Sequence, residues 1–256
     1  MTDQREQLPF DVLFVGGGPA NLSGAIQLMA LAKNKGLELE VALIEKGAEI
    51  GSHAVSGAIL NPRALEELMP DYENQGFPGE ATVRGDAFVF LTENQSFRLP
   101  FIPRYIHNSG FHVVSLSRFT RWLAEKAEAM GGNIFPGFAG VEVLYDDKGR
   151  SVIGVRTGDK GLDVDGSRKS TFEAGIDLTA KVTVFGEGAR GSLAASLEKQ
   201  LGLSARSMPQ AYETGIKEVI QLPENSFFDN QAFNCIHVLG YPLDLDLPGG
   251  GFIYEM

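Results

Sequence analysis

The N-terminal part of the chain alternates short apolar runs with a glycine-rich turn and a helical pattern. Asp11–Val15 is an apolar run that predicts a buried strand, and it leads directly into the glycine-rich sequence GGGPAN. From Leu22 the apolar residues recur at helical spacing as far as the break at Lys33–Gly36. A second apolar run, Val41–Glu45, predicts another buried strand. Strand, glycine turn, helix and strand within about 30 residues predict a βαβ unit with parallel strands.

Downstream patterns predict three more helices, a hairpin and a further strand. The first helix starts at Asn61-Pro62 and ends before Pro70. The second is capped by Ser117 and has the apolar face Phe119, Trp122, Leu123, Ala127 and Met130; a hairpin of Val141–Tyr145 with Ser151–Arg156 follows it. A strand over Val182–Phe185 then precedes a third helix, whose apolar face is Leu193, Leu197 and Leu201. The strand over Val182–Phe185 runs into a second glycine-rich turn, GEGARG.

These patterns predict an α/β fold with two parts. Residues 76–112 are rich in glycine, proline and aromatic side chains, and we interpret them as an irregular antiparallel insert in a first domain over residues 10–205. The segments TGIKEVIQL, CIHVLGYPL and GGGFIYEM predict the first strands of a β-rich substrate domain over residues 206–256. Because the chain stops after an apolar segment, which would leave a sheet edge unpaired, we expect this second domain to be incomplete.

Composition and charge exclude several classes of function. The formal net charge of −11 argues against a nucleic-acid partner, because phosphate affinity comes from clustered Lys and Arg. One cysteine, Cys235, excludes an internal disulfide and any iron–sulfur site built from several thiolates of this chain. The four histidines show no clustered ligand spacing, so we expect no metal site. No apolar run is long enough to span a bilayer, and no signal peptide is visible.

The first glycine turn has the positions of a dinucleotide-binding fingerprint. In such a turn the first glycine, Gly16, leaves the strand and the second, Gly18, lets the backbone approach a pyrophosphate at the helix N-terminus. Asn21 stands at the third position, which normally carries a glycine for close helix–strand packing. Glu45 ends the next strand, where an acid binds ribose hydroxyls, and Lys46 follows it. The predicted nucleotide-binding residues of this part are Gly16, Gly17, Gly18, Pro19, Ala20, Asn21, Glu45 and Lys46.

The second glycine turn favours FAD over NAD. Gly186, Glu187 and Gly188 follow a buried strand some 170 residues after the first turn. Two-domain FAD enzymes commonly have such a second glycine turn at the end of a strand beside the first βαβ unit. The alternative is a strand–turn–helix joint without ligand contact. We find no acid–base pair and therefore no catalytic side chain, which suits an enzyme whose flavin carries the redox chemistry.

With these motifs in view, the chain resembles the N-terminal part of the electron-transfer flavoprotein:ubiquinone oxidoreductase family. The resemblance runs from about Asp11 to the last residue. It is carried by DVLFVGGGPANLSGAI, LIEKGAEIGSHAVSGAILNPRALEELMPD, WLAEKAEAMGG, GVRTGDKGLDVDGSRKSTFEAGIDLTAKVTVFGEGARGSLA, ETGIKEV and HVLGYPLDLDLPGGGFIYEM. It implies a Rossmann-like FAD-binding domain of the glutathione-reductase/hydroxylase type, in a flavoprotein that passes electrons from reduced electron-transfer flavoprotein to ubiquinone.

The resemblance also implies roles for residues that spacing alone does not assign. Ser56 and Gly57 would lie near the flavin, and Gly249 and Gly250 would line the quinone pocket; from spacing alone, the latter pair is rather a tight turn. The stretch Ala54–Pro70 matches a segment that contacts one membrane leaflet, although its apolar face by itself favours core packing. The family implies a peripheral protein on the cytoplasmic face of the bacterial inner membrane. It also implies a [4Fe–4S] cluster, whose ligands are absent from this chain.

Two alternatives stay open at this point. The chain could be a related FAD-dependent reductase or monooxygenase without an iron–sulfur cluster, which would oxidise NAD(P)H. It could also be a flavin-binding fragment that catalyses nothing. We expect the chain to be inactive alone.

Overall fold

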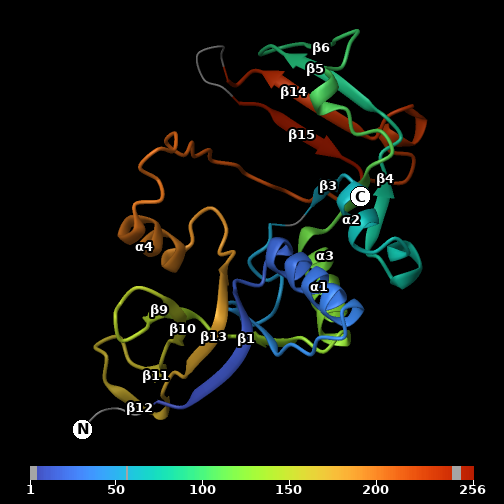
Figure 1. The fold of residues 1–256 in the computed structure, drawn as a ribbon. Helices are drawn as coiled ribbons and strands as arrows, with labels where there is room; N and C mark the ends of the chain where they lie inside the picture. Colours follow the sequence, from blue (N-terminus) through green and yellow to red (C-terminus); the bar gives the residue numbers. More distant parts are fainter. Residues whose placement is uncertain (1–4, 56, 244–248) are drawn as a thin grey trace. The chain divides into compact units, whose positions relative to one another are not determined.

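The computed structural model describes residues 5–55, 57–243 and 249–256, which divide into two compact units (Figure 1). Unit 1 contains the chain up to Ala54 together with Thr120–Thr214. Unit 2 contains Val55–Phe119 together with Gly215–Met256. This grouping differs from the expected division at residue 205, because the segment 76–112 is in the same unit as the C-terminal strands.

Unit 1 is built on a six-stranded mixed sheet. Its strands lie in the order β8 (Asn133–Pro136), β2 (Val41–Glu45), β1 (Gln7–Val15), β13 (Asp177–Phe185), β10 (Val152–Thr157) and β9 (Gly140–Tyr145). The first four are parallel to one another, β10 is antiparallel to β13, and β9 is antiparallel to β10. The predicted βαβ unit and the predicted hairpin are therefore confirmed. A separate hairpin of β11 (Lys160–Leu162) and β12 (Arg168–Glu173) lies between β10 and β13 in the sequence.

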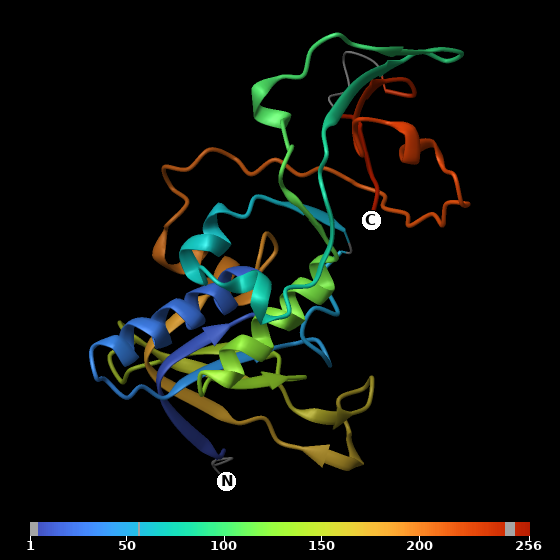
Figure 2. The ribbon, with the colours of Figure 1, turned by 90° about the vertical axis from the view of Figure 1, so that its right-hand side faces the viewer.

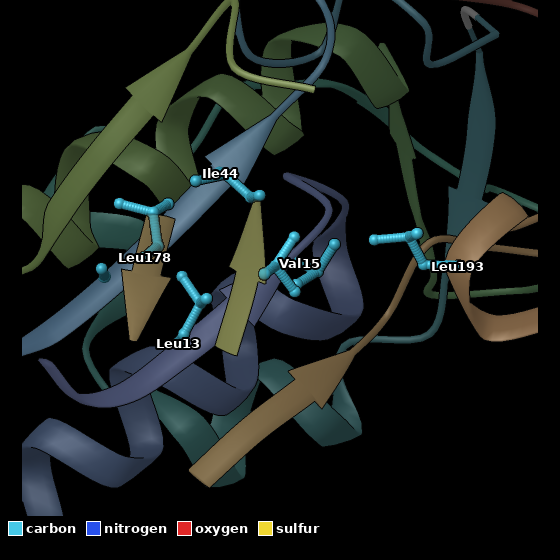
Figure 3. Close-up of a cluster of buried hydrophobic side chains, with 7 residues drawn as sticks. Leu13, Val15, Ile44, Leu178 and Leu193 are labelled. Carbon is cyan, nitrogen blue, oxygen red and sulfur yellow. The ribbon is translucent and has the colours of Figure 1, made fainter. Parts of the chain in front are cut away.

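The C-terminal end of strand β1, Leu13–Val15, is buried on both faces, as expected for a strand inside a parallel sheet. Leu13 and Val15 point to one face, where they join a core cluster with Ile44, Leu178 and Leu193 (Figure 3). Leu193 comes from α4 (Ser192–Leu201), so this helix covers that face. Phe14 points to the other face, because successive strand residues alternate sides. There its ring lies against Gly24 of α1 (Pro19–Asn34).

Helix α3 (Leu116–Ala129) runs beside α1 (Figure 2). The two helices meet near Gly132, where a Cβ atom would lie 3.0 Å from the Ala127 carbonyl oxygen and 3.3 Å from Met29 Cε. The predicted cap of α3 is wrong by two residues, since Ser117 lies inside the helix. Ser115 holds the cap position instead, and its hydroxyl accepts a hydrogen bond from the Arg118 N–H at 3.4 Å.

Unit 2 contains two smaller sheets. One has the order β15 (Gly251–Tyr254), β14 (Cys235–Gly240), β5 (Asp86–Leu91) and β6 (Ser96–Arg98); the other has the order β3 (Ala58–Leu60), β7 (His112–Val114) and β4 (Gly79–Thr82). The short helices are α2 (Arg63–Leu68) and the 3₁₀ turns η1 (Tyr72–Gln75), η2 (Arg104–Ile106) and η3 (Phe227–Asn230). Because β14 pairs in parallel with β5, strands more than a hundred residues apart in sequence share one sheet.

One predicted strand is absent from the described residues. The segment TGIKEVIQL has no regular secondary structure, and Ile216 and Val219 are 91% and 72% exposed. An apolar pattern with β-branched residues forms a strand only where a neighbouring strand pairs with its backbone. Within the described part of the chain, no strand pairs with the backbone of this segment.

Candidate functional site

The two predicted glycine turns lie against each other at the carboxyl ends of β1 and β13. The Gly16 N–H donates to the Ile44 carbonyl at 2.8 Å, and the Gly186 N–H donates to the Val15 carbonyl at 3.0 Å. Gly16 has φ +105°, and a Cβ atom there would lie 2.6 Å from the Gly186 carbonyl oxygen. Only glycine fits that position, for conformational and for steric reasons. The structure thus brings together residues that are 170 positions apart.

The N-terminus of α1 opens beside this junction. Gly18 is the N-cap residue with φ −81°, and a Cβ atom on it would meet nothing within 4 Å. Pro19 follows at the first helical position, where its missing N–H costs nothing, and Ala20 is exposed. The first turn of a helix leaves its N–H groups without intrahelical acceptors and attracts anions. The geometry therefore suits a phosphate group that approaches the backbone at Gly18.

Asn21 does not face this opening. Its side-chain Nδ2 donates to the carbonyls of Val15 and Gly16, both at 2.9 Å, and the residue is 3% exposed. A Cβ atom on Gly186 would lie 2.2 Å from Asn21 Oδ1, so the amide is packed directly against the second glycine turn. Asparagine therefore fills the place of the usual packing glycine and joins the two turns, while the backbone at Gly18 stays open.

Glu45 lies at the end of β2 and holds the backbone of the first turn. Its Oε2 accepts from the Gly17 N–H at 2.8 Å and its Oε1 from the Gly47 N–H at 2.7 Å. The exposed His53 ring lies 3.3 Å from the same Oε1. The carboxylate is thus fixed next to the glycine turn, where an acid can also accept hydrogen bonds from ribose hydroxyls. Lys46 is exposed to solvent.

The second glycine turn leads into helix α4. Glu187 caps this helix, because its carboxylate accepts from the Ala194 N–H at 2.6 Å and from the Leu193 N–H at 3.4 Å. Gly188 is exposed and has φ +78°, a conformation that favours glycine. The side chain of Glu187 is therefore occupied at α4, and what this turn offers a ligand is backbone.

Gly57, Gly249 and Gly250 belong to unit 2, and Ser56 lies outside the described residues. The Gly57 carbonyl accepts a hydrogen bond from Lys217 Nζ, which also lies 2.5 Å from the Tyr254 hydroxyl. Gly250 precedes β15, and a Cβ atom there would lie 2.5 Å from the Val238 carbonyl oxygen.

The stretch Ala54–Pro70 contains β3 and α2. The helix begins at Arg63 with Pro62 as its N-cap residue, one position later than predicted. Asn61 Oδ1 accepts a hydrogen bond from the Arg63 N–H at 3.1 Å. Leu65 and Met69, from the predicted apolar face, are 4% and 9% exposed and are buried in unit 2. No helix among the described residues combines the length and apolar character that crossing a bilayer requires.

Unit 2 also contains a polar cluster that the sequence analysis missed. Asp86 and Cys235 are register partners on β5 and β14, and His237 lies two residues further along the same face of β14. One ligand atom from each of these three residues lies within 4.8 Å of the other two. His237 Nε2 is 3.0 Å from Asp86 Oδ1 and 3.6 Å from Cys235 Sγ. The only sequence signal was the Cys-x-His spacing, which becomes meaningful once β14 is paired with β5.

Burial and hydrogen bonds set the charges in this cluster. Burial raises the pKa of the Cys235 thiol to about 12, with the Asp86 carboxylate adding to the effect. Burial also acts to raise the pKa of Asp86, but hydrogen bonds from the Asn108 backbone, His237 and the Asn108 amide outweigh it and lower that pKa. Asp86 is therefore a buried carboxylate, and Cys235 in this arrangement is a protonated thiol.

The chain is similar to curated electron transfer flavoprotein-ubiquinone oxidoreductases, described as mitochondrial, from several organisms. It is 47% identical to the Dictyostelium discoideum protein over 252 residues, which are 98% of this chain and 41% of that protein. It is 42% identical to the Arabidopsis thaliana protein over 254 residues (98% of this chain, 39% of that protein) and 42% identical to the Homo sapiens protein over 247 residues (96% and 39%). The predicted resemblance to the N-terminal part of such proteins is confirmed. The chain spans about 40% of the length of these relatives.

Solved structures support the fold. The flavin-dependent brominase Bmp2 matches with a TM-score of 0.50 and 19% identity over 75% of this chain and 40% of that chain. The flavin-dependent monooxygenase PieE, solved with FAD and substrate, matches with a TM-score of 0.50 and 18% identity over 74% of this chain and 32% of that chain. No family model matches the sequence. The predicted α/β, Rossmann-like fold of FAD-binding proteins is thus confirmed.

Proposed function

We propose that this chain binds FAD through the two glycine turns of unit 1 and supplies the flavin-binding part of an electron-transfer flavoprotein:ubiquinone oxidoreductase. The observation that carries the proposal is the junction of Gly16 with Gly186 beside an open helix N-terminus at Gly18. In this proposal the N–H groups of the first turn of α1 bind the pyrophosphate, and Glu45 binds the ribose of the adenosine half. The names of the relatives support the oxidoreductase class.

The remaining predicted contacts follow from the same resemblance. Gly186 and Gly188 would present backbone to the flavin nucleotide, and Ser56 and Gly57 would lie near its ring. When bound, FAD supplies the redox chemistry, while the protein positions it and excludes competing reactions. The described residues fit this division of roles, since the side chains of Glu187 and Asn21 are engaged in holding backbone.

The proposal also includes the electron donor, reduced electron-transfer flavoprotein, and the electron acceptor, ubiquinone. Gly249 and Gly250 would line the quinone site. We also retain as proposals the 10–205 and 206–256 domain assignment and a peripheral position on a bacterial inner membrane. The relatives are named as mitochondrial proteins. We also propose that the segment Ala54–Pro70 contacts the membrane. Leu65 and Met69 are buried, so any such contact would use other side chains of this segment.

The test of FAD binding uses the full chain and a matched pair of glycine variants. Gly18→Ala adds a methyl group in open space at an ordinary φ of −81°, so we expect a loss of only about 1 kcal/mol in stability, because alanine is a poorer N-cap residue than glycine. The same methyl group would obstruct the close approach of a pyrophosphate, so the FAD affinity measured by flavin fluorescence should fall about tenfold or more. Gly215→Ala is the control, because it also adds a methyl group in open space but lies in unit 2. Equal FAD affinities in all three proteins, or no binding by the unaltered chain, would contradict the proposal.

A second candidate function is a FAD-dependent reductase or monooxygenase. The fold shared with Bmp2 and PieE is compatible with it. NAD(P)H oxidation by the FAD-loaded chain, without reduction by an electron-transfer flavoprotein, would favour this candidate. A chain that binds FAD but is inactive in both assays would agree with a flavin-binding part that needs the rest of its protein.

A further inference from the structure

We propose that Asp86, Cys235 and His237 form a binding site for a divalent transition metal of the zinc class in unit 2. The inference is independent of FAD binding, because all three residues belong to the other compact unit. It rests on the convergence of three different ligand types, a carboxylate, a thiol and an imidazole, on one buried point. Thiolate, imidazole and carboxylate are the ligands that zinc takes in proteins, and binding would release to solvent the proton that the Cys235 thiol carries without the metal.

Two of the three distances between the ligand atoms are close to those of tetrahedral coordination. Metal–ligand bonds of about 2.3 Å to sulfur and about 2.0–2.1 Å to nitrogen or oxygen imply an S···N separation of about 3.6 Å and an O···N separation of about 3.3 Å. The structure has 3.6 Å between Cys235 Sγ and His237 Nε2, and 3.0 Å between His237 Nε2 and Asp86 Oδ1. On binding the ion, the edge between His237 Nε2 and Asp86 Oδ1 would lengthen by about 0.3 Å. The ligand atoms of Asp86 and Cys235 lie within 4.8 Å of each other.

The backbone holds these ligands without help from the metal. Asp86 and Cys235 face each other across the parallel pair β5–β14, and the side chains of Asp86 and His237 are 0% and 14% exposed. The Asn108 N–H donates to Asp86 Oδ2 at 2.8 Å, which fixes the carboxylate and leaves Oδ1 turned toward His237. Hydrogen bonds to a ligating carboxylate are the usual support of a metal site.

Asn108 marks the fourth position. Its Nδ2 lies 3.0 Å from Asp86 Oδ1, 3.2 Å from His237 Nε2 and 3.9 Å from Cys235 Sγ. The two hydrogens of this amide have acceptors in Asp86 Oδ1 and the Ile106 carbonyl, the latter at 3.0 Å. In the metal-bound form the Asn108 amide would withdraw from the three ligand atoms, and a water molecule or the Asn108 carbonyl oxygen would complete the tetrahedron.

Cobalt(II) is the probe, because a cobalt–thiolate bond absorbs in the near ultraviolet. Since Cys235 is the only cysteine in the chain, any such charge-transfer band reports this residue. After treatment with a chelator, the full chain should bind one equivalent of Co²⁺ with that band and with the intense visible bands of tetrahedral cobalt. One equivalent of Zn²⁺ should abolish both.

Variants distinguish a built site from adventitious thiol binding. We expect Cys235→Ser to lose the charge-transfer band, and Asp86→Asn and His237→Ala each to weaken cobalt binding on the order of tenfold or more. His53→Ala removes a histidine from unit 1 and should leave the titration unchanged. Circular dichroism establishes that each variant is folded, and the titration of the unaltered chain is decisive even if one is not. Absence of the band in that chain would overturn the inference and leave a metal-free hydrogen-bond network. Cobalt binding by Asp86→Asn and His237→Ala as tight as by the unaltered chain would do the same.

Discussion

Replacing Asn21 by alanine tests whether its amide joins the two glycine turns. The change deletes the Nδ2 donor of two hydrogen bonds of 2.9 Å, to the carbonyls of Val15 and Gly16, in a residue that is 3% exposed. The Val15 carbonyl keeps its hydrogen bond from Gly186, whereas Gly16 loses this side-chain partner. The helix start itself stays intact, because Gly18 rather than Asn21 is its N-cap residue.

The magnitude follows from these contacts. Two buried hydrogen bonds contribute about 1 kcal/mol each, and the emptied volume against Gly186 adds to the loss. Alanine is a better helix former than asparagine and recovers about 0.5 kcal/mol. We therefore expect unfolding to cost about 2 kcal/mol less, which lowers the midpoint of thermal unfolding by roughly 4–8 °C for a chain of this size.

Asn21→Asp separates this role from a direct contact with phosphate. Aspartate has the same shape, but it would place a carboxylate oxygen against the two carbonyl oxygens that Nδ2 now contacts. A buried, unpaired charge costs about 3–5 kcal/mol, whereas an acid near a helix N-terminus returns only about 0.3–1 kcal/mol. We therefore expect Asn21→Asp to be less stable than Asn21→Ala, with no FAD added.

The assay is thermal unfolding of the flavin-free chain, followed by circular dichroism. Gln27→Ala is the control, because Gln27 is an exposed residue of the same helix and its loss should change stability by less than about 0.5 kcal/mol. An unchanged midpoint for Asn21→Ala, together with a raised midpoint for Asn21→Asp, would refute the reasoning. Asn21 would then act as an ordinary residue of the first helical turn.

Three further predictions concern stability. Gly16→Ala should lower the free energy of unfolding, measured in a denaturant titration, by more than about 2 kcal/mol. The added methyl group combines a φ of +105° with a contact of 2.6 Å to the Gly186 carbonyl oxygen. If the variant is as stable as the unaltered chain, the turn relaxes and the reasoning is wrong. Arg5 lowers the pKa of Asp159 to about 2, below the value of about 3.9 in an unfolded chain. The unfolded state therefore binds more protons between these values, so the contribution of Asp159 is complete above about pH 4 and is lost as the pH falls toward 2. Asp159→Asn should flatten this acid branch of the stability curve, and an unaltered branch would count against the ion pair. In α4, Leu197→Ala should cost about 2–5 kcal/mol and Leu201→Ala less than about 0.5 kcal/mol, since the side chains are 7% and 56% exposed; equal losses from the two would contradict the orientation of the helix.

The sequence predicted the two glycine turns at the ends of their strands because their signals are local. Gly16, Gly18 and Glu45 have fixed spacings within one βαβ unit, and the structure brings them together with Gly186. The sequence did not predict where the Asn21 side chain would point. That direction depends on the second glycine turn, which is distant in the chain and supplies the surface on which the amide packs.

The polar cluster shows the opposite case. Asp86 begins one apolar strand and Cys235 begins another, and nothing in either segment specifies that they pair. The same dependence on a partner explains why the strand predicted over TGIKEVIQL is absent from the described structure, because apolar spacing alone does not provide a neighbouring strand.

By itself, the sequence determined the strand–turn–helix elements of unit 1 and the positions of their glycines, because hydrophobic period and glycine conformation act over a few residues. The tertiary structure alone decided which distant segments share a sheet, since strand pairing joins backbones without regard to their separation in sequence. For this reason the segment 76–112 became part of a unit with the C-terminal strands, and Asp86, Cys235 and His237 came to face one another.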